Sequence, residues 1–185
     1  MFARSCAGSA GGGCARVCQG CAGQQRAVVP CAAMSSPFSP ERLRDATTVF
    51  RAEPRLVRFH DVDAARTMFF ARYFDWASEV YLAQLMAHGV DVPGMLTRQE
   101  LALPLRHVEA SYRAPLFFGD RVVVELVAVD LGTTSFSLGF RVRAEGDPAK
   151  HHAYVQTVHV CIDPQGFRPV AVPAAVREAL LSAET

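Results

Sequence analysis

The chain has 185 residues, half of them hydrophobic and a fifth charged, with a formal net charge of +1 at pH 7. This composition is typical of a globular protein and excludes a mostly disordered chain. The near-neutral charge argues against a nucleic-acid binder that works through a large basic excess. No apolar run approaches the roughly 18 residues needed to cross a bilayer. We therefore expect one folded domain with no nucleic-acid and no membrane partner.

Residues 1–33 differ in composition from the rest of the chain. They hold five of the six Cys residues, no Asp, no Glu and no periodic apolar pattern. We interpret them as an N-terminal extension outside the fold, either disordered or not translated because synthesis starts at Met34. A transit peptide is a second interpretation, since the segment has basic residues without acids, but it lacks amphipathic spacing. A secretory signal is disfavoured because the segment has no apolar core.

A third interpretation of this segment is chemical. Cys14, Cys18 and Cys21 form a C-x3-C-x2-C pattern that is similar to the cluster-binding triplet of radical SAM enzymes, in which three thiolates hold an iron–sulfur cluster. The rest of the chain is too short and differently patterned for that class, and no His pair lies nearby to complete a zinc site. The folded part, 34–185, contains only Cys161 and can form no internal disulfide, which suits the reducing cytoplasm.

The folded part contains patterns for a strand, a long helix, four more strands and a short helix, in that order. The first strand alternates over 56–61 and begins as early as Thr48. Apolar and small side chains then recur at three- and four-residue spacing over 70–88, which predicts a helix that stops at Gly89. Turn signals separate the later elements: strands at 103–113, 121–131, 135–144 and 152–162, and a short helix at 174–182.

This order of elements indicates an α+β fold, with five antiparallel strands and one central helix. One helix hides only one face of such a sheet, so the open edges and the remaining apolar surface suggest oligomerisation. After the long helix, Pro93 and Gly94 predict a loop. The sequence contains no Gly-rich phosphate loop, no Gly-x-Ser-x-Gly nucleophile elbow and no HExxH motif.

The segment between the first strand and the long helix carries the chemistry. It places Asp63 near the start of the helix, where free backbone N–H groups and a partial positive charge are available. Acyl transfer or hydrolysis requires at least two groups: an N–H that polarises the carbonyl, and a carboxylate that attacks the carbonyl carbon or activates water. The alternative is that Asp61 or Asp63 merely caps a turn or the helix.

The same segment resembles a known family, the 4-hydroxybenzoyl-CoA thioesterase branch of the hotdog-fold thioesterases. Residues 61–65, Asp-Val-Asp-Ala-Ala, fit its Asp-x-Asp-x-(Ala/Gly)-Gly motif, and residues 69–73, Phe-Phe-Ala-Arg-Tyr, fit the aromatic pair that opens its helix. Residues 112–120, followed by the valines 122–124, match its aromatic-x-x-Pro-Leu stretch, Gly-Asp and valine-rich strand. The resemblance covers about 55–163 and, within the branch, is nearest to 1,4-dihydroxy-2-naphthoyl-CoA hydrolases.

The resemblance implies a hotdog fold, in which a five-stranded antiparallel sheet wraps around one long helix and a short helix ends the chain. It implies an acyl-CoA thioesterase that releases a free acid, aromatic acids included, and CoA. An acyl carrier protein is an alternative carrier of the thioester. The family further implies a homodimer or homotetramer, with each site between two subunits and with no metal and no cofactor.

The family's roles fall on particular residues of this chain. Asp63 is the expected general base or nucleophile, and the backbone N–H of Phe70 is the expected oxyanion donor. Phe69, Phe70 and Tyr73 are candidates to line the acyl pocket. Arg66 stands where most members have Gly, a residue that permits unusual dihedral angles and a close approach of substrate. Arg66 either narrows the pocket, binds an acidic group of the substrate or marks a member with a changed function.

Other assignments are weaker. A hotdog protein that binds thioesters without hydrolysing them is suggested by Arg66, whereas the intact Asp63 argues against it. A dehydratase or hydratase uses a His at the helix, but Phe70 occupies that position and His60 is misplaced. Glu79 is an alternative helix carboxylate, although a solvated Glu is more typical there. Five basic residues are candidates for contacts to the CoA phosphates: Arg106, Arg113, Arg141, Arg143 and Lys150.

Overall fold

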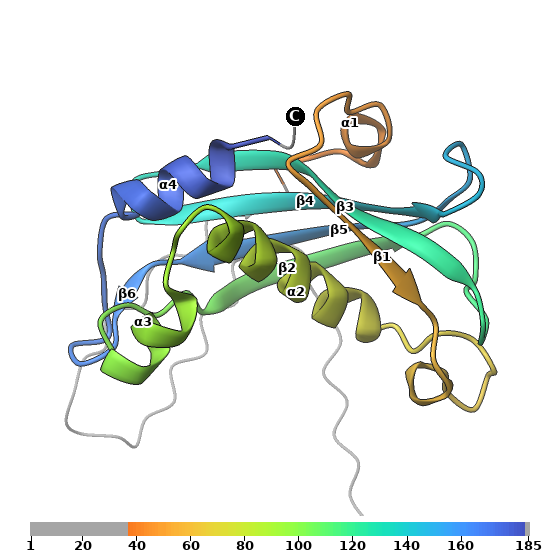
Figure 1. Ribbon diagram of the computed structural model, residues 1–185, viewed down its shortest axis with the longest axis horizontal. Helices are drawn as coiled ribbons and strands as arrows, with labels where there is room; N and C mark the ends of the chain where they lie inside the picture. The colour runs from red at the N-terminus through yellow and green to blue at the C-terminus, as the bar shows by residue number, and fades with distance from the viewer. Residues whose placement is uncertain (1–36, 184–185) are drawn as a thin grey trace, which may run out of the picture. The chain divides into compact units, whose positions relative to one another are not determined.

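One five-stranded antiparallel sheet and one 16-residue helix dominate the molecule (Figure 1). The computed structural model describes residues 37–183, so the predicted extension at 1–33, with its cysteine triplet, lies outside the described residues. In chain order the elements are α1 (Pro40–Arg44), β1 (Arg51–Leu56), the 3-10 helix η1 (Phe59–Asp61), α2 (Arg72–Ala87), α3 (Val92–Arg98), β2 (Leu105–Tyr112), β3 (Arg121–Leu131), β4 (Ser135–Ala144), β5 (His151–Val160), β6 (Ile162–Asp163), β7 (Arg168–Pro169) and α4 (Ala174–Leu181).

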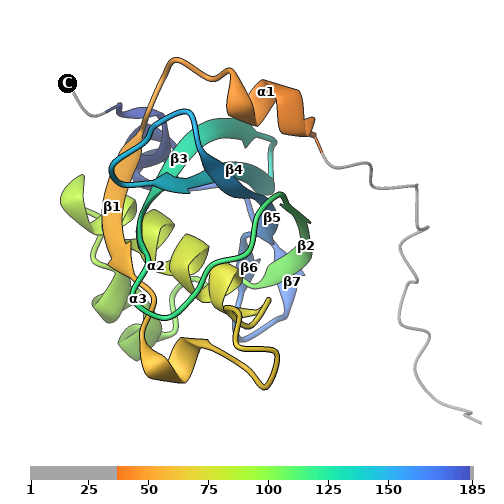
Figure 2. The same cartoon turned by 90° about the vertical axis from the view of Figure 1, so that its right-hand side faces the viewer.

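The sheet has the strand order β1-β3-β4-β5-β2, with antiparallel neighbours throughout, so β1 and β2 form its two edges. It curves around α2, as Figure 2 shows. Ala77, Val80 and Leu85 of the helix are fully buried in the same core cluster as Leu126 and Phe140 of the sheet. The predicted α+β fold, with a sheet wrapped around one long helix and a short C-terminal helix, is confirmed.

A second, smaller core covers the outer face of the sheet, away from α2. It joins Phe38 and Leu43, from the segment around α1, to Val127, Ala128 and Tyr154 of the strands. The backbone N–H of Phe38 donates to the side-chain oxygen of Gln156 over 3.0 Å, and the side-chain amide of Gln156 donates back to the Phe38 carbonyl. Chain that precedes the first strand is therefore part of the folded domain from Phe38 onward.

The predicted first strand is wrong over most of its length. The strand β1 ends at Leu56, and the chain from Phe59 to Asp61 forms a 3-10 turn in which Phe59 is 80% exposed. The alternation continues past Leu56, but the Asp61 carboxylate accepts the N–H of Arg58 over 2.8 Å. This local bond replaces a strand bond and turns the chain. The alternation of apolar and polar residues does not show that a side chain will take the place of the partner strand in this way.

The loop predicted around Pro93 and Gly94 is also wrong, because these residues lie in the first turn of α3. The Asp91 side chain caps the helix by accepting the N–H of Gly94 over 3.0 Å. Proline is tolerated in the first turn, where its missing N–H costs nothing. The Asp-x-Pro pattern was the overlooked signal, and Ser39 before Pro40 opens α1 in the same way.

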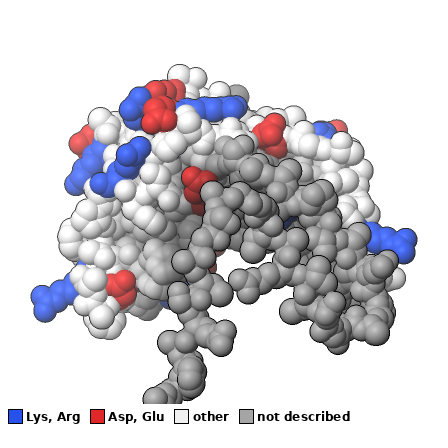
Figure 3. All heavy atoms as spheres, turned by 180° about the vertical axis from the view of Figure 1, so that it is seen from behind, with Lys and Arg blue, Asp and Glu red and all other residues white. Residues whose placement is uncertain are grey.

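Surface charges of both signs are interspersed on the described part of the face seen in Figure 3. Within residues 37–183, no helix is long and apolar enough to span a membrane. The same part of the chain contains no cluster of three or more His, Cys, Asp or Glu side chains that could hold a metal ion.

Gly139 of β4 provides a test of the outer core. A Cβ atom there would lie 2.4 Å from a terminal carbon of Leu43, which is fully buried and has little room to move. We expect Gly139→Ala to lower the free energy of unfolding by about 1–3 kcal/mol, as overpacking does. Urea unfolding measures the change. Gly146→Ala is the matched control, because a Cβ at Gly146 meets nothing within 4 Å; equal stability of the two variants would contradict the packing argument.

Candidate active site at the start of helix α2

The carboxylate of Asp61 holds the chain between β1 and α2. Asp61 is 4% exposed, and besides the bond from the Arg58 N–H, its Oδ1 lies 3.6 Å from Nε of Arg72 and 3.4 Å from Nε2 of His60. Its backbone carbonyl accepts the N–H of Phe69 over 2.8 Å. The first Asp of the motif therefore has a structural role: its side chain connects the 3-10 turn to Arg72, the first residue of the helix.

The second Asp of the motif, Asp63, opens a tight turn on the surface. Its N–H donates to the Thr67 carbonyl over 3.0 Å, its carbonyl accepts the N–H of Arg66 over 2.9 Å, and its Oδ1 accepts the N–H of Ala65 over 2.8 Å. Arg66 has a φ of +65°, in the left-handed region that favours glycine. The backbone thus makes the turn that a glycine would make, at a cost of about 1–2 kcal/mol for a residue with a side chain.

A hollow of about 320 Å³ lies where this turn meets the helix. Phe70 lies in it, two residues before the first residue of α2, so the helix begins slightly later than predicted. Within residues 37–183, no group accepts a hydrogen bond from the Phe70 N–H. The hollow is lined by Thr67, Met68, Phe70, Tyr73, Tyr112, Arg113, Ala114, Pro115 and Leu116. It therefore combines an unused backbone donor with mainly apolar and aromatic walls.

Two tyrosines shape this hollow. The Tyr112 hydroxyl donates to the Phe70 carbonyl over 3.2 Å, and the rings of Tyr73 and Tyr112 meet almost edge to face, with centroids 5.1 Å apart. Burial, with smaller contributions from Tyr112 and Asp120, raises the pKa of Tyr73 to about 12. Tyr73 is therefore a neutral wall at physiological pH. Tyr112 was not assigned a role from the sequence, although it begins the aromatic-x-x-Pro-Leu stretch that carried the resemblance.

The structure brings together only part of the predicted site. Phe70 and Tyr73 line the hollow, whereas Phe69 does not; its ring packs against that of Phe70, with centroids 4.6 Å apart. Asp63 and Arg66 are exposed and do not line the hollow either. Asp63 is bonded through its backbone to the lining residue Thr67, which places the turn at the margin of the hollow.

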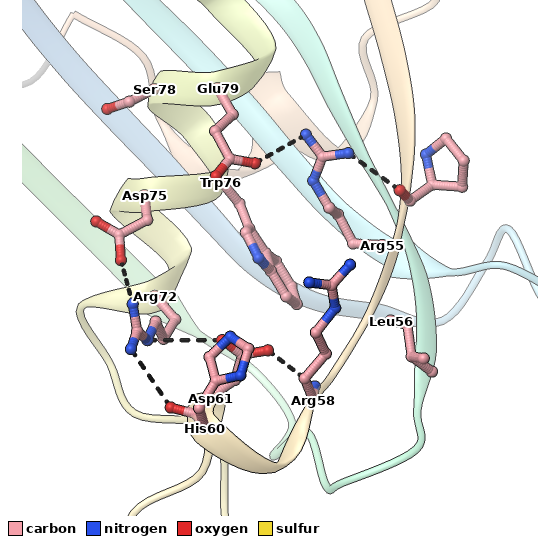
Figure 4. Close-up of a pocket in the computed structure, with 11 residues that line it drawn as sticks. Arg55, Leu56, Arg58, His60, Asp61, Arg72, Asp75, Trp76, Ser78 and Glu79 are labelled. Atoms are coloured by element: carbon pink, nitrogen blue, oxygen red, sulfur yellow. Dashed lines mark hydrogen bonds and ion pairs between the residues drawn. The ribbon is translucent and has the colours of Figure 1, made fainter.

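A larger hollow, of about 560 Å³, lies on another side of the helix, between α2 and β1 (Figure 4). Arg55 of β1 lies 3.1 Å from the Glu79 carboxylate of α2 and so bridges the two elements, whereas Arg72 lies 3.0 Å from Asp75 along the same helix. Trp76 forms part of its wall. The alternative carboxylate Glu79 therefore belongs to this second hollow and pairs with Arg55 instead of facing Phe70.

Two of the basic residues considered for the CoA phosphates, and one buried histidine, have structural positions. Arg141 and Arg143 both bind the buried carboxylate of Glu125, over 2.7 and 2.8 Å. His159 stacks on Phe136 and packs against Tyr81, and burial lowers its pKa.

Cys161 is fully buried in the main core, and burial raises the pKa of its thiol. A thiol in this environment stays protonated and unreactive at neutral pH.

Comparisons with known proteins agree with this picture. Residues 57–180 match the family described as the thioesterase-like superfamily. The 1,4-dihydroxy-2-naphthoyl-CoA hydrolase of Trichodesmium erythraeum is 32% identical over 131 residues, which cover 71% of this chain and 95% of that protein. The enzyme of the same name from Synechococcus elongatus is 32% identical over 125 residues, covering 67% of this chain and 90% of that protein.

Solved structures share the fold. The crystal structure of a 1,4-dihydroxy-2-naphthoyl-CoA thioesterase from Synechocystis superposes with a TM-score of 0.66 at 24% identity, covering 70% of this chain and 94% of that one. A structure of the dynemicin thioesterase gives a TM-score of 0.63 at 25% identity, covering 70% and 93% of the two chains. The family match spans most of the described residues, and the matched relatives are named as thioester hydrolases. The chain therefore belongs to the thioesterase-like superfamily and is a thioester hydrolase with the hotdog fold.

Proposed function

We propose that the protein hydrolyses an aromatic acyl-CoA to the free acid and CoA. The observation that carries this proposal is the unused N–H of Phe70 in a hollow walled by Tyr73 and Tyr112, next to the turn that holds Asp63. Flat aromatic walls suit a flat aromatic acyl group. The relatives named as 1,4-dihydroxy-2-naphthoyl-CoA hydrolases support the same substrate class and favour CoA over an acyl carrier protein as the carrier.

Asp63 is the group we propose for the chemical step. One of its carboxylate oxygens accepts the Ala65 N–H, and the other remains open to solvent and substrate. As a general base, Asp63 takes a proton from water while the oxygen of that water bonds to the thioester carbon. The Phe70 N–H donates to the oxyanion that forms. Collapse of this intermediate breaks the C–S bond, and the proton passes to the departing sulfur. As a nucleophile, an Asp63 oxygen would bond to the thioester carbon, the C–S bond would break and release CoA, and water would then cleave the anhydride to the free acid and the Asp63 carboxylate.

Arg66 is proposed to contact the substrate. Its guanidinium is exposed and makes no hydrogen bond or ion pair within residues 37–183, and it follows Asp63 in the same turn. Because the turn keeps the conformation that glycine favours, the presence of Arg66 is no argument for a protein that binds thioesters without hydrolysing them.

We further propose that the protein forms a homodimer or a homotetramer through the edge strand β2. The two edges of the sheet differ in protection. Strand β1 contains Pro54, which lacks an N–H, and charged residues on both sides of it. Strand β2 has eight residues without a proline and has no partner on its outer side within the described residues. An open, regular edge of this kind pairs readily with another strand. Since Tyr112 ends β2, a second copy paired there would lie beside the hollow at Phe70.

Asp63→Asn tests the chemical role. The amide keeps the shape and can still accept the Ala65 N–H, but it can take no proton from water. We expect kcat for 1,4-dihydroxy-2-naphthoyl-CoA to fall about a hundredfold or more, as general-base effects predict, with an unchanged melting temperature. Release of CoA thiol measures turnover. Near-wild-type turnover would exclude Asp63 as base and as nucleophile.

Arg66→Gly separates the backbone from the side chain at the turn. Glycine adopts the same φ without strain, so kcat should stay within about twofold, whereas loss of an exposed charge contact should raise KM about two- to fivefold. Arg66→Lys, which keeps the charge, is the matched control. An unchanged KM in Arg66→Gly would show that the side chain does not meet the substrate.

Solution mass and hydrogen exchange test the oligomer. We expect at least twice the 20.1 kDa chain mass by light scattering at micromolar concentration. The outward-facing amides of β2 should exchange slowly and those of β1 rapidly, because pairing protects only the covered edge. A monomer, or fast exchange along β2, would contradict this interface.

A further inference from the structure

We propose that Arg113 binds the phosphates of CoA, and that a second hollow next to α1 receives that end of the substrate. This inference deepens the proposed function by locating the non-reacting part of the same substrate. CoA carries a pyrophosphate and a 3′-phosphate, and arginine suits phosphate because its planar guanidinium presents several N–H donors at once.

The structure first removes two of the five basic candidates. Arg141 and Arg143 both bind Glu125, whose side chain is only 5% exposed. Arg141 also donates to the backbone carbonyls of Arg44 and Ala46. Recruiting either guanidinium to a phosphate would leave a buried carboxylate short of a partner, which is costly. Their role is to hold the outer face of the sheet.

Arg113 differs from them because it lies between two hollows. It lines the hollow that contains Phe70 and Tyr73, and it also lines a separate hollow of about 320 Å³ next to α1. It follows Tyr112, the residue whose hydroxyl bonds the Phe70 carbonyl. A thioester whose carbonyl lies at the Phe70 N–H therefore has Arg113 on the way from the first hollow to the second. Neither Arg106 nor Lys150 lines either hollow.

The guanidinium of Arg113 is oriented but not neutralised. It lies over the Tyr154 ring, 5.6 Å from the ring centroid, and no carboxylate lies within ion-pair distance of it among residues 37–183. Stacking on an aromatic face fixes the plane of the guanidinium and leaves the N–H groups at its edge free for an anion.

The remaining charges of the second hollow are mostly occupied. Arg44 makes a two-point pair with Asp45, at 2.8 and 2.9 Å. His151 bonds the Tyr154 hydroxyl, and burial lowers its pKa, so it adds no positive charge at neutral pH. Glu41 also lines this hollow. Among the described residues, Arg113 is thus the cation of this hollow that has no carboxylate within ion-pair distance, although it interacts with Glu41 at longer range. Glu41 is the negative group that a bound phosphate would meet.

This arrangement predicts opposite effects from two substitutions. In the full-length chain, calorimetry would measure the Kd of CoA and of pantetheine, which lacks the phosphates. We expect Arg113→Gln to weaken CoA about tenfold and to leave pantetheine unchanged, because a charge-assisted contact to phosphate is lost. Glu41→Gln should tighten CoA about two- to threefold, because a repulsion is removed, again without effect on pantetheine.

Arg121→Gln is the matched control for the loss of one positive charge. Its side chain is 70% exposed and it lines neither hollow, so CoA binding should not change. Equal losses in Arg113→Gln and Arg121→Gln, or no loss in either, would overturn the proposal. An Arg113→Gln variant with unaltered CoA affinity and normal hydrolysis would do the same while leaving the proposed function intact. CoA binding that depends on Arg113, in a protein that hydrolyses no thioester, would instead refute the proposed function alone.

Discussion

The burial of one face of α2 inside the curved sheet is the constraint on which the rest of the structure depends. Ala77, Val80 and Leu85 are completely shielded from solvent there. Each buried aliphatic side chain of the valine or leucine type stabilises the fold by about 1.5–3 kcal/mol, so the helix cannot slide or rotate without losing much of the core. The start of the helix is therefore a fixed point, and Asp61 extends this rigidity to the preceding turn through Arg58, Arg72 and the N–H of Phe69.

The two hollows beside this helix differ in chemistry. The larger one, between α2 and β1, is lined mostly by charged side chains, and two ion pairs lie there, Arg55 with Glu79 and Arg72 with Asp75 (Figure 4). In the smaller one, the Phe70 N–H has no acceptor in the described part of the chain, and the lining residues are mainly apolar and aromatic. Size therefore does not identify the site. A backbone N–H without an acceptor, beside aromatic side chains, is the better guide, because it can bind the carbonyl oxygen of a substrate with an aromatic acyl group.

The outer face of the sheet adds a different kind of order. Two sets of contacts hold the segment around α1 on the strands β4 and β5. Arg141, which pairs with the buried Glu125, also donates to backbone carbonyls of that segment, and the side-chain amide of Gln156 bonds both backbone groups of Phe38. Buried ion pairs contribute little net stability but are costly to break, so they specify where this segment lies. That placement creates the hollow next to α1, with Arg113 exposed at its margin.

The sequence by itself determined the elements that local patterns encode. The runs at 121–131 and 135–144 became β3 and β4 with unchanged bounds, and the spacing over 70–88 predicted α2 to within two residues. The motif around Asp63 determined the family. Local patterns failed where one side chain decides the outcome: Asp61 turns the chain after β1, and Asp91 caps the helix that Pro93 seemed to exclude.

Only the tertiary structure decided which residues share a hollow. Phe70 and Tyr112 are 42 positions apart, yet they are joined by one hydrogen bond, because the order of strands brings the end of β2 to the start of α2. In the same way, the fold distinguishes Arg113 from Arg141 and Arg143, although the sequence offers no reason to treat these three arginines differently. A guanidinium next to a buried carboxylate is committed to the fold, whereas the exposed guanidinium of Arg113, which lies over the Tyr154 ring, is available to a ligand. That difference depends on burial and distance.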